Sequence, residues 1–186
     1  MIYTFIPYSP EKNLYEAYNR YMALLPNDDD FACLLDHDIM FTTYEWFNQM
    51  TEITEKYKEC GCFVATTNRI GGERQRADVK IDDDIRYNRH VGRQIKKQFG
   101  STIEDFTENK PHDLCGFLIL LKKETWKKIG GFEAWDRGSG LLGIDSKLHR
   151  KLITVNEKVY IMKGIYLYHW YSGWDGHGGR DKSHLI

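Results

Sequence analysis

Apolar and polar positions alternate along the chain in a way that predicts strands and helices in turn. Short runs of apolar, β-branched and aromatic residues are typical of strands. The predicted strands cover residues 2–6, 31–35, 62–67, 116–121, 159–162 and 165–168. Apolar residues spaced by three or four predict helices over residues 13–25, 46–57 and 123–129, and a further helix that starts at Asp145. This alternation indicates an α/β fold with a mixed central sheet flanked by helices.

Two segments between these elements are less regular. Thr42-Thr43-Tyr44-Glu45 resembles a capping box, which predicts that the Thr42 side chain caps the second helix. Residues 68–113 are rich in charge and glycine and poor in periodicity, so we expect a long binding loop there. Within it we expect a helix only around Val91–Phe99, and we interpret Asp82–Asp84 as a solvated acidic turn.

Composition indicates an ordinary globular domain. Of the 186 residues, 41% are hydrophobic and 28% are charged, and the net charge is −1. This charge gives no reason to expect binding to a nucleic-acid backbone. No apolar run is long enough for a membrane span and no leader precedes the first strand, so we expect a cytoplasmic protein. The four cysteines form no C-x-x-C pair, which argues against a zinc site.

Asp36 and Asp38 are the first candidates for chemistry. They directly follow the apolar strand 31–35, and side chains at i and i+2 of an extended chain leave the same face. Two hard oxygen ligands at a strand end suit Mn²⁺ or Mg²⁺, which keep water or phosphate in their remaining positions. The alternative is a pair of solvated acids in a turn, because short motifs also occur by chance.

Three further features accompany this pair. Asp145 lies at a predicted helix start, where the helix dipole favours its ionised form. His169 ends the last predicted strand, and imidazole is a competent ligand for Mn²⁺. Residues 171–186 have the composition of a flexible lid that closes on phosphate. The polar and aromatic residues among its glycines include Trp174, His177, Arg180 and Lys182. The alternatives are a helix cap, a strand-end histidine and a frayed terminus.

In this order, the elements resemble the GT-A-fold glycosyltransferases of the inverting, family-2-like group. One similar block is the helix from Asn13 to Asn19 with the strand 31–35 and Asp36-His37-Asp38, which resembles the family's D-x-D motif. The second block resembles the acceptor half of the family. It comprises Gly116-Phe117-Leu118-Ile119, Trp126, Ile129-Gly130-Gly131-Phe132-Glu133 and Gly143-Ile144-Asp145. Tyr168-His169-Trp170 matches the position of a metal-ligand histidine in several members. The blocks cover about half of the chain.

The resemblance implies a role for each of these residues. Asp38 and His169, together with Asp36, would hold Mn²⁺ or Mg²⁺, and Asp36 would also face the ribose or sugar hydroxyls. Asp145 would take the proton from an acceptor hydroxyl, with inversion at the sugar. Further donor-binding residues would be Pro7, Tyr8, Ser9, Asn19, His37, Trp174, Arg180 and Lys182. Trp135 and Trp174 are candidates to stack on sugar faces. The implied donor is a UDP-sugar, with a GDP-sugar as the second choice.

Two departures from the family pattern shape this expectation. Members have a further β-α-β unit before the helix that leads to D-x-D, whereas here Pro7-Tyr8-Ser9-Pro10 enters that helix directly. Gly143-Ile144-Asp145 stands where members have G-E-D, so only the aspartate carries over. We therefore expect a single GT-A (Rossmann-like) domain truncated in its N-terminal half. Residues 1–67 would form the nucleotide- and metal-binding half, 68–170 the acceptor half and 171–186 the lid. Such a minimal enzyme is of the kind that a virus carries, acting in the host cytoplasm.

Two other functional classes remain open at this point. A metal-dependent nucleotidyltransferase or phosphohydrolase also pairs carboxylates around phosphate, but it calls for more acidic ligands and often a second ion. A non-catalytic nucleotide-sugar-binding module would keep the metal site and need no base. If Asp145 is structural, the alternative bases are Asp136, Glu133 and Asp113.

Overall fold

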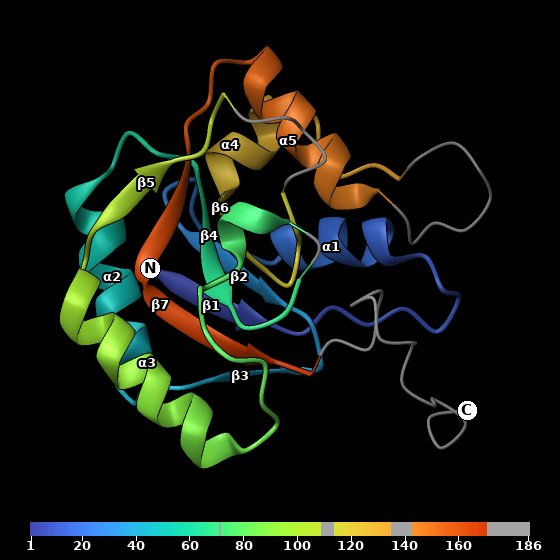
Figure 1. Ribbon diagram of the computed structural model, residues 1–186. Helices are drawn as coiled ribbons and strands as arrows, with labels where there is room; N and C mark the ends of the chain where they lie inside the picture. The colour runs from blue at the N-terminus through green and yellow to red at the C-terminus, as the bar shows by residue number, and fades with distance from the viewer. Residues whose placement is uncertain (71, 109–113, 135–142, 171–186) are drawn as a thin grey trace.

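The computed structural model describes the chain except for residues 71, 109–113, 135–142 and 171–186 (Figure 1). Its described strands are β1 (Ile2–Phe5), β2 (Phe31–Leu35), β3 (Ile39–Phe41), β4 (Cys62–Thr67), β5 (Ile103–Asp105), β6 (Leu118–Lys122) and β7 (Val159–His169). The described helices are α1 (Leu14–Ala23), α2 (Trp46–Lys56), α3 (Ile85–Phe99), α4 (Lys123–Lys128) and α5 (Ile144–Thr154), with a 3-10 turn, η1, at Glu73–Gln75. The predicted α/β fold with a mixed sheet is confirmed.

The described strands form one seven-stranded sheet in the order β1-β2-β6-β4-β7-β3, and β5 also pairs with β7. β1 is parallel to β2 and β4 is parallel to β7, while β6 lies antiparallel between β2 and β4. The four strands β1, β2, β4 and β7 therefore point the same way, and their carboxyl ends share one edge of the sheet. In open α/β sheets this edge is where ligands bind.

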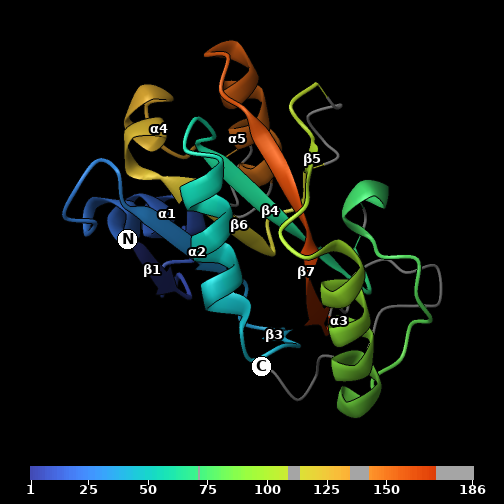
Figure 2. The ribbon, with the colours of Figure 1, turned by 90° about the vertical axis from the view of Figure 1, so that its left-hand side faces the viewer.

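Helices cover both faces of the sheet. On one face, Leu148 and Leu152 of α5 share an apolar cluster with Val64 of β4 and with buried residues of α1. On the other face, Met50 and Ile53 of α2 belong to a second cluster. Figure 1 shows α1 and α5 to the right of the sheet and α2 to its left. In Figure 2, α3 lies beside the end of β7. Within the described residues, no helix combines the length and the apolar character needed to cross a bilayer.

Two local predictions around the sheet are wrong. The segments 159–162 and 165–168 form a single strand, β7, and the irregularity at this point is a register shift between Ala65 and Thr66 of the neighbouring β4. Thr42 does not cap a helix either. α2 begins at Trp46, and the Thr42 hydroxyl instead donates to the backbone carbonyl of Tyr166 in β7. A nearby acceptor in the sheet has thus replaced the local cap.

The expected long loop at 68–113 contains more order than its composition suggests. The helix predicted around Val91–Phe99 is confirmed, but it begins earlier, at Ile85, and β5 follows it. Asp83 and Asp84 are exposed, as the solvated-turn interpretation predicts, but each also makes a hydrogen bond that supports the fold. Asp84 caps α3 by accepting from the backbone N–H of Arg86 (2.8 Å), and Asp83 accepts from the Tyr168 hydroxyl (2.9 Å).

Candidate metal centre

The two predicted aspartates lie at the shared carboxyl edge, directly after β2. The chain is not extended there as we expected, because residues 37 and 38 form a turn that reverses it into β3. The backbone N–H of Asp36 donates to the Phe117 carbonyl (3.0 Å), and the Asp38 carbonyl accepts from the N–H of Trp170 (2.9 Å). β3 then pairs with β7 so that Ile39 stands opposite His169. The turn and this pairing place Asp38 beside the last residue of β7.

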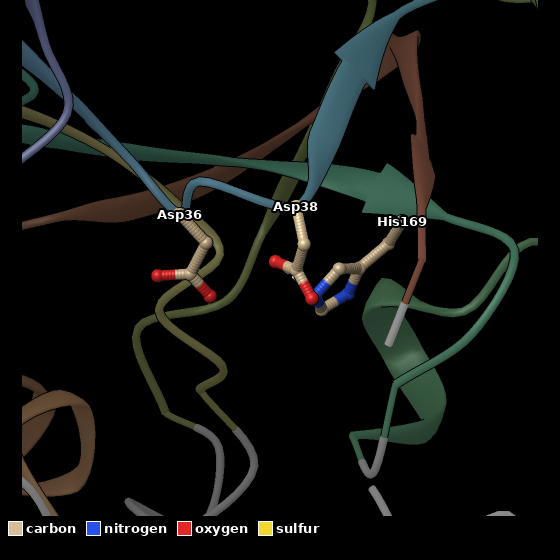
Figure 3. A group of neighbouring side chains, drawn as sticks. All are labelled: Asp36, Asp38 and His169. Carbon is tan, nitrogen blue, oxygen red and sulfur yellow. Dashed lines mark ion pairs between the residues drawn. The ribbon is translucent and has the colours of Figure 1, made fainter. Parts of the chain in front are cut away.

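Asp36, Asp38 and His169 form a compact cluster of three oxygen and nitrogen ligands. One ligand atom from each residue lies within 4.8 Å of the other two. His169 Nε2 is 3.3 Å from Asp38 Oδ1. Figure 3 shows the two carboxylates directed the same way from the turn, with the His169 ring against Asp38. Two ligand atoms that each lie about 2.1 Å from one cation are at most roughly 4.2 Å apart, so a small approach of the side chains lets the three residues hold one ion.

Histidine 169 is held in the orientation that a metal ligand needs. Its ring is buried and stacks on Phe117, with 5.5 Å between ring centroids. Its Nδ1 lies 3.1 Å from the backbone carbonyl of Arg69, and its backbone N–H donates to Asn68 Oδ1 (2.8 Å). A carbonyl only accepts, so Nδ1 carries the hydrogen, and in the neutral ring Nε2 keeps its lone pair facing the aspartates. Metal-binding histidines are typically fixed by such an outer hydrogen bond.

The two aspartates differ in their electrostatics. Burial raises the pKa of Asp36 to about 6, with the charge of His169 acting in the opposite direction and that of Asp38 adding to the rise. Within the described residues, no group donates a hydrogen bond to the Asp36 side chain. Burial would also raise the pKa of Asp38, but the hydrogen bond and charge of His169 in its protonated form, with the charge of His37, outweigh it and lower that pKa. Asp36 is therefore an incompletely compensated carboxylate beside a second one, which favours a bound cation.

Asp145 lies on the same side of the site as Asp36. Two adjacent residues before β6 link Asp145 to Asp36. The backbone N–H of Gly116 donates to Asp145 Oδ2 (3.3 Å), and the carbonyl of Phe117 accepts from the backbone N–H of Asp36. A side chain at Gly116 would bring a Cβ to 3.3 Å from the Asp145 Cβ, so this approach is close. The charge of Asp145 also contributes to the raised pKa of Asp36.

The expected protonation behaviour of Asp145 needs correction. We expected the helix start to favour its ionised form, but burial raises its pKa, and the N–H groups of Ser146 and Gly116 offset this only in part. Asp145 also does not cap α5 with its side chain, because Gly143 is the N-cap and Asp145 is the second helical residue. Desolvation outweighs the dipole at this position, so Asp145 is a stronger base than an exposed aspartate.

Other predicted residues take different places. Pro7, Tyr8 and Ser9 follow β1, at the same sheet edge as the metal cluster, and His37 is exposed in the turn between its two aspartates. Asn19 has a structural task. Its side-chain oxygen accepts from Trp126 Nε1 (2.8 Å) and from the Phe132 N–H (2.8 Å), and its amide donates to the Phe132 carbonyl (3.0 Å). It thereby ties α1 to the Gly130-Gly131 turn.

Several predicted residues lie outside the described part of the chain. These are Trp174, Arg180 and Lys182 of the expected lid, Trp135, and the alternative bases Asp113 and Asp136. The third alternative base, Glu133, is described. A hydrogen bond from Lys151 is the main cause of its lowered pKa, with Lys147 also close, so it is a poor proton acceptor.

Sequence reasoning missed three residues around the site. Asn68 and Arg69, which orient His169, follow β4 and were taken as part of a loop. The shared edge of parallel strands is the signal that would have identified them. Tyr18 was assigned to the buried stripe of α1, and its ring does pack edge-on against Phe132, 5.0 Å between centroids. Its pKa is raised mainly by burial, and the charges of Asp36 and Asp145 add to the rise.

No protein-family model matches the chain, and no curated protein matches it significantly. The chemistry of the site is therefore what indicates its function. That chemistry is a fixed histidine nitrogen and two carboxylates that suit a hard or borderline divalent cation, with a third carboxylate, Asp145, whose pKa is raised by burial.

Proposed function

We propose that this protein is a metal-dependent glycosyltransferase. It would move a sugar from a nucleoside diphosphate sugar to an acceptor hydroxyl, with inversion at the anomeric carbon. The observation that carries the proposal is the cluster of Asp36, Asp38 and His169 at the carboxyl edge of the sheet, with Asp145 tied to the same segment before β6. The resemblance of the sequence to inverting GT-A enzymes supports the same assignment. By that resemblance the donor is a UDP-sugar, with a GDP-sugar as the second choice.

In this proposal the three ligand residues hold one Mn²⁺ or Mg²⁺. The cation supplies positive charge beside the diphosphate leaving group. Asp38 Oδ1 and His169 Nε2 lie 3.3 Å apart and are the two ligand atoms whose positions are already close to each other. Asp36 adds the carboxylate that has no hydrogen-bond donor in the described structure and also faces the sugar or ribose hydroxyls.

Asp145 is the proposed general base. It accepts the proton of the acceptor hydroxyl while that oxygen forms a bond to the anomeric carbon and the diphosphate oxygen leaves with the electron pair. Burial has raised its pKa, which strengthens it as a base.

The composition of the cluster favours glycosyl transfer over the phosphoryl-transfer alternative. Enzymes that transfer phosphoryl or nucleotidyl groups often use two ions bridged by several carboxylates. Within the described residues, the cluster has two aspartates and one histidine, which suits a single ion. A purely binding module would give no reason for a third carboxylate, Asp145, with a raised pKa close by.

Product analysis with a panel of UDP- and GDP-sugars, Mn²⁺ and mixed hydroxyl acceptors tests the proposal. We expect nucleoside diphosphate as the released product, and its release to be lost with EDTA and in the Asp38→Asn variant. Asp78→Asn, a change at an exposed aspartate outside the cluster, is the matched control and should retain the activity.

Other products would decide between the alternatives. Release of a nucleoside monophosphate together with a sugar phosphate would identify a phosphohydrolase and overturn the proposal. Metal-dependent binding of UDP or GDP without any product across the panel would identify a binding module.

A further inference from the structure

The outer face of α3 concentrates positive charge. Arg86, Arg89, Arg93, Lys96 and Lys97 recur at spacings of three and four, and the helix contains no Asp or Glu. These spacings put the cations on one face, where they repel one another. The whole chain has 26 basic and 27 acidic residues, so a solvated helix of average composition would mix the two signs.

Local interactions account for only part of this charge. Lys96 and Lys97 lie in the last turn of α3, where the helix dipole favours cations. Arg86 pairs with Asp84 at the start of the helix (3.3 Å). Arg89 and Arg93 lie in the middle of the helix, where the dipole gives them no advantage.

Four of these cations line one cavity of about 300 Å³. They are Arg89, Arg93, Lys96 and Lys97, and the opposite wall is the segment from Thr42 to Glu45, which joins β3 to α2. Figures 1 and 2 both place α3 next to β3. We call this space the α3 cleft.

Close packing fixes the two walls of the α3 cleft. Gly92 lies in the middle of α3, where glycine is unfavourable for a helix. A Cβ at this position would lie 2.0 Å from Thr42 Oγ1 and 2.6 Å from Thr42 Cβ, so only glycine permits this approach. Thr42 is in turn anchored to β7 through its hydroxyl. The cations are therefore held against the opposite wall by the fold itself.

The lining groups leave most of the positive charge uncompensated. Arg89 lies over the ring of Tyr44, 4.6 Å from the centroid, and Tyr44 is 83% exposed. Lys96 pairs with Glu45 (3.1 Å), the one acid among the lining residues. Arg93 and Lys97 are exposed and make no ion pair or hydrogen bond with side chains of the described residues.

We propose that the α3 cleft binds a phosphate-bearing group. A phosphate offers several acceptor oxygens and a dense negative charge, which suits two guanidinium groups and two ammonium groups facing one space. Thr43 adds a hydroxyl on the opposite wall. The cleft is separate from the metal cluster, because Thr42 follows Asp38 by four residues along β3, roughly 13 Å at 3.3 Å per residue. This site goes beyond the proposed glycosyl transfer and does not depend on it.

Binding of inorganic pyrophosphate in the presence of EDTA, measured by calorimetry at low and at higher salt, tests this site. We expect binding that weakens with salt, as for any exposed cationic site. The double variant Arg93→Gln/Lys97→Gln should bind roughly tenfold more weakly or worse, because it removes two charge-assisted partners. Arg86→Gln/Lys58→Gln removes the same charge outside the cleft and should bind like the wild type.

A second arm identifies the source of the phosphate. Flotation with vesicles of phosphatidylcholine alone, or with equal parts of phosphatidylcholine and phosphatidic acid, tests a lipid headgroup. Binding of either pyrophosphate or the acidic vesicles that the cleft variant loses and the control variant keeps supports the proposal. Absence of binding to both pyrophosphate and acidic vesicles, or equal loss in the two double variants, overturns it. Asp38→Ala should still bind pyrophosphate in EDTA, so failure of the metal site would be distinguished from failure of this one.

Discussion

Asp36 and Asp38 are separated by one residue, but their carboxylates differ in surroundings and in pKa. Asp38 faces His169 and has a lowered pKa, whereas Asp36 is partly buried without a hydrogen-bond donor among the described residues and has a pKa of about 6. In the metal-free protein Asp36 is therefore a destabilising group at neutral pH. Carboxylates with perturbed pKa values are typical of functional sites, and here the proposed cation would balance the charge of Asp36.

Replacement of Asp36 by Asn should stabilise the metal-free protein. The folded protein holds a proton on Asp36 more tightly than the unfolded chain, so its stability falls as pH rises from about 4 to 6. Above pH 6 the whole penalty is present, on the order of 2–3 kcal/mol. Urea unfolding in EDTA should show Asp36→Asn to be more stable than wild type at pH 7.5 and equal to it near pH 4. The exposed control Asp78→Asn should show no such difference, and a less stable Asp36→Asn at pH 7.5 would contradict the argument.

The variant Asp145→Asn tests whether Asp145 acts as the general base or only has a structural role. Gly116 and Ser146 donate to different oxygens of Asp145, and Asn keeps the size of the side chain and one oxygen that can accept from one of them. We therefore expect the variant to fold, to bind Mn²⁺ and nucleotide with wild-type affinity in calorimetry, and to lose ~10²–10⁴-fold in turnover number. Transfer at the wild-type rate would show that Asp145 only holds the segment before β6. Glu133→Gln, which removes a carboxylate already paired with lysines, is the matched control.

At the scale of elements, the short strand β3 organises both candidate sites. Its pairing with β7 places Asp38 beside His169 at one end, and at the other end it leads to Thr42 beneath α3. A one-residue slip in this pairing would turn every side chain of the strand to the opposite face. The contact between Gly92 and Thr42 helps to prevent such a slip, because it fixes the far end of β3 against a helix.

Gly92→Ala should therefore destabilise the protein, although alanine is the better helix former. Alanine at an open helical site gains about 1 kcal/mol over glycine. Here the added Cβ would lie 2.0 Å from Thr42 Oγ1, and we expect a net loss of roughly 1–3 kcal/mol from overpacking. Denaturant unfolding measures the loss. Adding Thr42→Ala should recover only part of it, because the Thr42 Cβ itself would lie at 2.6 Å. A Gly92→Ala variant more stable than wild type would show that the helix is free to move.

At the scale of the whole molecule, the sequence predicts what is local and misses what depends on strand order. The buried runs of β2, β4 and β6 are apolar at almost every position and were predicted within about two residues. β3 has three half-buried residues and gives no recognisable pattern. Asp36, Asp38 and His169 were predicted, since each adjoins an apolar strand. Asn68 and Arg69 were missed because their role follows from the parallel pairing of β4 with β7, which is not visible along the chain.

Mn²⁺ should raise the thermal stability of the whole domain, and the effect should depend on pH. A ligand that binds only the folded state at a hundred times its Kd adds about 2.7 kcal/mol, which for a chain of this size corresponds to roughly 5–10 °C in Tm. Binding requires ionised Asp36, so the shift should shrink as pH falls through about 6. Differential scanning fluorimetry of wild type, Asp38→Ala and Asp78→Asn with and without Mn²⁺ at pH 7.5 and 5.0 measures it. We expect a shift in wild type and Asp78→Asn at pH 7.5, a small one at pH 5.0, and none in Asp38→Ala. An equal shift in Asp38→Ala would place the ion elsewhere, and an unchanged shift at pH 5.0 would remove Asp36 from its ligands.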